Sequence, residues 1–166
     1  MDIVESAEGV SPATVQQLQI IAFSMGAGLV TMSSLIAWFY FKAAELAPAS
    51  EHVRAVNSLT TIAMLVAVSC IVASEIVWRQ VLKKSTGALS DRVRTAFIVR
   101  LALREGAGLV GMVVAYIAAL NGVLRAYPAY WVNLAPYGLF LGFLATHWPT
   151  SGKLADEARE ILGSGL

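Results

Sequence analysis

Long apolar runs separated by short polar segments form the main pattern of this 166-residue chain. The runs cover residues 19–41, 58–78, 101–124 and 129–148. A helix rises ~1.5 Å per residue, so about 20 apolar residues are enough to cross a hydrocarbon layer ~30 Å thick. The pattern therefore predicts four membrane-spanning helices within a single domain, residues 1–166.

Polar and helix-breaking residues mark the ends of these runs. Ser11-Pro12 is typical of a helix start, because serine caps free N–H groups and proline suits the first helical position. Ser90-Asp91 predicts the start of the third helix, and Pro149 ends the fourth run. Beyond it, residues 151–162 repeat apolar side chains on one stripe, at Leu154, Ala158, Ile161 and Leu162. We expect a short amphipathic C-terminal helix there.

Basic residues near the runs predict the orientation, because they are enriched on the cytoplasmic side of membrane proteins. With four spans, the N-terminus, the middle loop and the C-terminus share one side. That side carries Arg79, Lys83, Lys84, Arg92, Arg94, Lys153 and Arg159, whereas the other carries Lys42, Arg54 and Arg125. We therefore expect a multi-pass inner-membrane protein with both termini in the cytoplasm.

Composition agrees with a membrane protein and narrows the range of possible functions. The chain is 57% hydrophobic and 14% charged, whereas soluble domains carry about 25% charged residues. A net charge of +1 gives no reason to expect nucleic acid. The sequence has no cysteine-rich cluster, nucleophile motif or phosphate loop. We expect a lipid-embedded protein that is not an enzyme and needs no metal or cofactor.

A short motif occurs twice in the chain. Gly26-Ala27-Gly28-Leu29-Val30 returns as Gly106-Ala107-Gly108-Leu109-Val110, on the first helix of each half. Two readings remain open, a duplication and a coincidence of common residues. The expected fold is all-α, an integral membrane four-helix bundle, made under the first reading from two related helical hairpins.

Small residues form stripes on the first and third helices, and they predict where helices pack. Helix association in lipid depends on close approach of backbones, which small side chains permit. The candidate packing residues are Gly26, Gly28, Ala107, Gly111 and Ala115. Packing within one bundle is the favoured interpretation, and packing between subunits is the alternative.

Ionisable residues inside the predicted spans are the functional candidates, because charge is costly in hydrocarbon. Arg79 follows Glu75 by four residues, so these two can pair along one helix near the membrane surface. Glu105 shares a face with small residues and has Arg104 beside it. We expect Glu105 to form a structural ion pair with another helix or to share a proton with Glu75. Ion binding or translocation is the alternative.

Part of the third span resembles a known family. Leu101-Ala102-Leu103-Arg104-Glu105 followed by Gly111-Met112-Val113-Val114-Ala115 is similar to the carboxylate helix of the rotary ATP synthase proteolipid, subunit c. The resemblance implies that Glu105 would carry the ion. The first span lacks the Gly-x-Gly-x-Gly run of that family.

The whole chain resembles small, uncharacterised bacterial four-helix membrane proteins through Glu105-Gly106 and Pro149-Thr150. That likeness implies no activity. The leading hypothesis is a non-enzymatic inner-membrane protein, either homo-oligomeric or an accessory subunit of a larger complex. The alternative is a proteolipid-like ring subunit that translocates ions through Glu105.

Overall fold

The computed structural model describes residues 10–43 and 47–163, and it is all-α. Three long helices pack together: α1 (Pro12–Lys42), α2 (Ser50–Lys84) and α3 (Leu89–Leu120). After them come α4 (Val123–Ala126), the 3₁₀-helix η3 (Pro128–Leu134), α5 (Ala135–Thr146) and α6 (Ser151–Gly163). The predicted all-α class and the C-terminal helix are thus confirmed. Two helices, α1 and α2, are long and apolar enough to cross a membrane.

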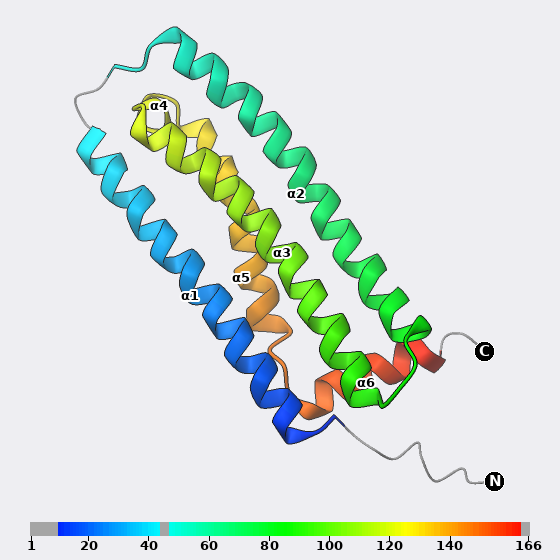
Figure 1. Ribbon diagram of the computed structural model, residues 1–166. Coiled ribbons are helices and arrows are strands. Elements are labelled where there is room, and N and C mark those ends of the chain that lie inside the picture. The colour runs from blue at the N-terminus through cyan, green and yellow to red at the C-terminus, as the bar shows by residue number, and fades with distance from the viewer. Residues whose placement is uncertain (1–9, 44–46, 164–166) are drawn as a thin grey trace, which may run out of the picture.

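The long helix α3 is the centre of the fold. Figure 1 shows α3 between α1 and α2, with α5 behind it and α6 across one end. The largest interface joins α2 to α3, and further interfaces join α3 to α1, α5 and η3. Within the described residues, α1 and α2 barely touch each other. The first two helices therefore do not form the packed hairpin that the repeat predicts.

The two copies of the repeated motif also lie in different environments. Leu29 is buried in the core, whereas Leu109 is largely exposed. Gly28 is exposed, whereas its counterpart Gly108 is buried against the backbone of Tyr137. Equivalent positions of the two copies therefore differ in burial and in their contacts, so the structure gives the duplication no support.

A narrow stripe of α2 packs on α3. Its buried residues recur at intervals of seven or four, so they fall on one face. They are Val56, Ala63, Ala67, Ser74, Trp78 and Leu82. The rest of the α2 surface carries large apolar side chains that are about half exposed or more: Ile62, Leu65, Val68, Val72 and Ile76.

Small residues of α3 allow the chain after it to approach closely. Ala107 and Ala115 are fully buried. At Gly111 an added Cβ would overlap the carbonyl oxygen of Asn133 in η3, and at Gly108 it would lie 3.5 Å from the Tyr137 Cα. Only glycine at position 111 lets η3 pack where it does.

The fourth predicted span is not one continuous helix, which corrects the expectation for residues 101–124 and 129–148. The third helix ends at Leu120, and Gly122 then takes a left-handed conformation with φ 70°. Glycine adopts such angles without steric cost. Pro128 begins η3 and Pro136 lies in the first turn of α5. Prolines lack the N–H that helix interiors need, so the segment divides between these two helices.

The helix starts follow the capping expectation only in part. The Ser11 side chain accepts a hydrogen bond from the Thr14 backbone N–H at 3.2 Å, as predicted for α1. At α3 the cap position belongs to Ala88 and no side chain caps it. The Ser90 hydroxyl instead lies 2.9 Å from the Thr14 hydroxyl. This serine therefore ties α3 to the start of α1.

Charged residues gather toward the two ends of the bundle. The start of α1, the α2–α3 turn and α6 lie at one end, and the end of α1, the start of α2 and α4 lie at the other (Figure 1). We call the first the α6 end. The α6 end carries Arg79, Lys83, Lys84, Arg92, Arg94, Lys153 and Arg159. The orientation predicted for a membrane needs these segments on one side, and the fold brings them together.

Candidate functional site: a buried ion cluster beside a cavity

Two arginines of α3 and two glutamates from other helices form one ion cluster near the α6 end. Arg100 donates from Nε and Nη2 to Glu75 of α2, with distances of 2.9–3.0 Å. Arg100 Nη1 donates to Glu157 of α6 at 3.0 Å. Arg104 Nη2 donates to the same Glu75 at 2.5 Å. The cluster therefore joins α2, α3 and α6, and its formal charges cancel.

Helix geometry explains why these groups meet. Arg100 and Arg104 are four residues apart, so both lie on the same face of α3. The opposing helix α2 brings Glu75 to that face, and the amphipathic α6 brings Glu157. Helix α6 is held in position by Leu154, Ala155 and Ala158, which are buried on its apolar stripe. The site thus depends on three separate segments of sequence.

Aromatic rings cover the cluster. The Arg100 guanidinium lies 5.1 Å from the Trp78 ring centre and 4.9 Å from that of Phe143. Arg104 lies 4.1 Å from the Phe143 ring centre. Arg100 is only 6% exposed. Ion pairs in poorly solvated surroundings are strong only when their hydrogen bonds are satisfied, and here Arg100 uses all three of its nitrogens.

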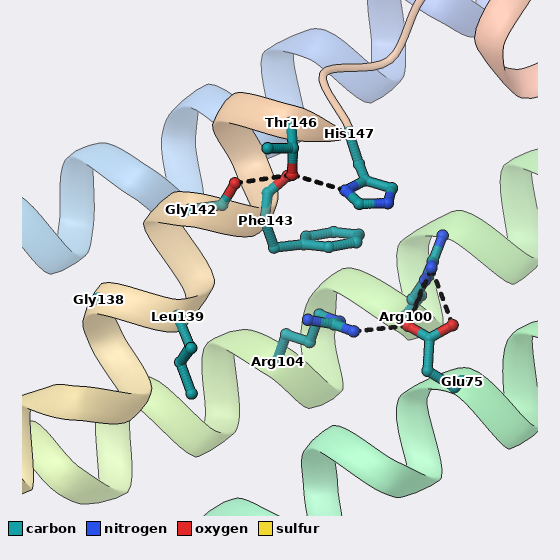
Figure 2. Close-up of a pocket in the computed structure, with 9 residues that line it drawn as sticks. All are labelled: Glu75, Arg100, Arg104, Gly138, Leu139, Gly142, Phe143, Thr146 and His147. Atoms are coloured by element: carbon teal, nitrogen blue, oxygen red, sulfur yellow. Dashed lines mark hydrogen bonds and ion pairs between the residues drawn. The ribbon is translucent and has the colours of Figure 1, made fainter.

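A cavity of about 590 Å³ opens beside the cluster. Figure 2 shows Phe143 between His147 and the two arginines, with the α5 backbone forming the opposite wall. His147 stacks on Phe143 at a ring-centre distance of 4.5 Å. The lining residues are Glu75, Arg100, Arg104, Gly138, Leu139, Gly142, Phe143, Thr146 and His147. The cavity is apolar along α5 and polar toward the α6 end.

Glu105 lies on a different face of α3 from its neighbour Arg104, because consecutive helical residues point about 100° apart. Its carboxylate is partly exposed and makes no ion pair or hydrogen bond with any residue in the described part of the chain. The expected structural pair at Glu105 is therefore not formed.

Arg79 is exposed and does not join the cluster. The expected pair with Glu75 along α2 is absent from the described contacts, because both Glu75 oxygens accept hydrogen bonds from α3 instead. Arg79 lines a smaller hollow of about 140 Å³ together with Glu157 and Glu160. Of the four predicted ionisable residues, the structure brings together Glu75 and Arg104.

Of the five predicted packing residues, four are buried and one is exposed. Gly26 is buried, and a Cβ there would lie 3.3 Å from Leu144 of α5. Gly28 faces open space. Ala107, Gly111 and Ala115 are buried on α3. Packing inside one chain thus accounts for all of them except Gly28.

Sequence reasoning missed Arg100, Glu157 and Phe143 as parts of the site. The four-residue spacing of Arg100 and Arg104 beside an apolar run was the available signal. Glu157 gave no signal, because a glutamate on an amphipathic helix is usually solvated. Among the described residues, no three His, Cys, Asp or Glu side chains gather as metal ligands do.

A family-model comparison gives no match to the chain, and comparisons with curated proteins and with solved structures find no significantly similar protein.

Proposed function

We propose that the chain is a multi-pass inner-membrane protein that catalyses no reaction and works as a subunit of an oligomer or a larger membrane complex. The exposed surfaces of α1 and α2 support the membrane location. Only 22% of the most apolar stretch of α1 and 17% of that of α2 are buried within the protein. A helix from a soluble core would be mostly buried, so these surfaces suit lipid or other membrane helices.

Exposed hydroxyl groups on these helices support the same location. Ser24 and Thr31 of α1 donate to the carbonyls of Ile20 and Ala27, four residues earlier. Ser69 of α2 donates in the same way to Leu65 at 2.8 Å. Hydrocarbon offers polar groups no water, so each hydroxyl must find a partner within the protein.

The observation that carries the subunit role is the uncovered face of α3, defined here by Glu105, Leu109 and Val113. Leu109 is 41% exposed and Val113 46% exposed in the middle of the central helix. Glu105 has no partner among the described residues, and an unpaired carboxylate is costly at membrane depth. A neighbouring membrane helix that brings a basic residue would cover the apolar positions and pair with Glu105.

Purification in mild detergent tests this role. We expect the protein to resist alkaline extraction from membranes and to elute as an assembly larger than a monomer. Val113→Trp should reduce that assembly to a monomer without lowering its melting temperature, because the side chain faces out of the bundle. Leu65→Trp, on the exposed face of α2, is the matched control. A wild-type protein that elutes as a monomer with nothing bound would contradict the proposal.

A proteolipid-like ring subunit is the second candidate, favoured by the position of Glu105. Arg104 is held by Glu75 on another face, so it does not neutralise Glu105. Rapid labelling of Glu105 by dicyclohexylcarbodiimide, suppressed by sodium, would favour ion translocation. Labelling that is slow and insensitive to sodium would leave the accessory role as the better account.

A further inference from the structure

The cavity beside the ion cluster has features of a lipid site. It lies between α5 and the paired helices α2 and α3, and its volume is about 590 Å³. We propose that it binds an anionic glycerophospholipid, with the phosphate at Arg104 and one acyl chain along α5. This inference rests on the membrane location proposed above and is independent of any protein partner.

The two arginines differ in how much hydrogen-bonding capacity they have left. Arg100 makes four hydrogen bonds to carboxylates with its five N–H groups, from Nε, Nη1 and Nη2. Arg104 donates only from Nη2. Its Nε is buried with no partner among the described residues, and its Nη1 makes no hydrogen bond to them either. Because phosphate accepts charge-assisted hydrogen bonds from guanidinium groups, Arg104 is the available anchor.

Glu75 also lines the cavity, and its charge would oppose an anion if it were free. It is not free: Oε1 accepts hydrogen bonds from both arginines, and Oε2 accepts one from Arg100. The cluster is neutral as a whole, so further cations at the rim decide the sign of the site. Lys153 supplies one such cation. Its Nζ donates to the carbonyl of Thr146, a residue that lines the cavity, at 3.1 Å.

His147 adds a polar ring edge on the same rim. Its Nδ1 lies 2.8 Å from the Thr146 hydroxyl, which itself donates to the Gly142 carbonyl at 2.8 Å. This contact occupies the Nδ1 edge of the ring. Stacking on Phe143 fixes the ring. The imidazole therefore presents Nε2 as its free edge, with no partner among the described residues.

The α5 wall has room for an acyl chain. Gly138 and Gly142 lie one turn apart on it, and a Cβ built on either would meet nothing within 4 Å. Leu139 is 59% exposed beside them. This strip is apolar and leads away from the charged rim, as the chain of a lipid leads away from its headgroup.

Native mass spectrometry of the full chain, released from nanodiscs, tests the proposal. Phosphatidylglycerol should be retained about tenfold or more over phosphatidylcholine, which is the scale of one or two charge-assisted hydrogen bonds. Gly142→Leu puts a branched side chain into the cavity, where a Cβ meets nothing within 4 Å, and should abolish that preference. Gly28→Leu, a matched change into open space on α1, should leave it intact.

Three results would overturn the lipid assignment. One is an unchanged preference in Gly142→Leu. Another is equal retention of the two lipids by the wild-type protein. The third is equally tight binding of sn-glycerol 3-phosphate, which would make the cavity a site for a soluble phosphate ester. Alkaline extraction of the cell membranes that contain each variant separates these outcomes from a failure of the membrane proposal. A soluble protein would leave the membrane fraction altogether.

Discussion

Glu75 pairs with Arg104 and Glu105 directly follows that arginine in the sequence, yet the surroundings of the two glutamates are opposite. Glu75 accepts hydrogen bonds from Arg100 and Arg104, beneath the ring of Phe143. Glu105 directly follows one of those arginines and has no partner in the described part of the chain. The difference comes from helix faces, because α3 turns Arg104 toward α2 and Glu105 toward its uncovered side. One face of α3, called the closed face below, packs against other helices of the chain. The other face is available to a partner.

The largest expected effect is at the centre of the closed face. Arg100→Met removes a buried guanidinium and leaves Glu75 and Glu157, whose side chains are 37% and 30% exposed, without their main cation. We expect a loss of about 2–4 kcal/mol in unfolding free energy, less than for a fully buried pair because the carboxylates are partly exposed, measured by denaturation in detergent. Adding Glu75→Gln should recover part of this loss. A loss below about 1 kcal/mol would show that the cluster behaves like a solvent-screened surface pair.

The two glutamates themselves give the sharpest contrast. Glu75→Gln removes the charge that both arginines contact, so we expect a loss of about 2–3 kcal/mol. Glu105→Gln should change stability by less than about 0.5 kcal/mol, because no contact within the chain is lost. Melting temperatures of the two variants in the same detergent provide the comparison. Equal destabilisation would mean that Glu105 is paired in the folded protein.

Glycine positions on the closed face and on the exposed surface form another pair. A side chain at Gly111 would overlap the Asn133 carbonyl, so Gly111→Leu should cost about 1–3 kcal/mol through displacement of η3. Gly28→Leu meets open space and should be neutral. If both variants melt like the wild type, η3 does not pack against α3 as described.

The smallest perturbation tests orientation alone. Single cysteines at Ser85, in the α2–α3 turn, and at Ala126, at the opposite end, should leave stability unchanged in a background lacking Cys70. An impermeant thiol reagent added to whole cells should label position 126 and spare position 85, since basic residues favour the cytoplasmic side. The reverse pattern would mean an inverted protein.

The sequence predicts the long elements well, because apolar runs and prolines act locally. Helices α1, α2 and α6 lie close to their expected positions. The break after Leu120 was missed. Glycine and proline also occur inside membrane helices, so Gly122 and Pro136 did not mark the break in the sequence. The partner of Glu75 could not be predicted either. Choosing between Arg79 on the same helix and Arg100 on another requires the register of α2 against α3, which depends on tertiary packing.

The central claim is that the Glu105 face of α3 closes on another membrane protein or a second copy of the chain. Photo-crosslinking in native membranes tests it directly, with a photoreactive residue at Val113 and, as control, at Leu65 on the exposed side of α2. The account predicts a protein adduct from position 113 and none, or only lipid, from position 65. Lipid adducts alone from both positions would show that the α3 face is bare in the membrane and would contradict the account.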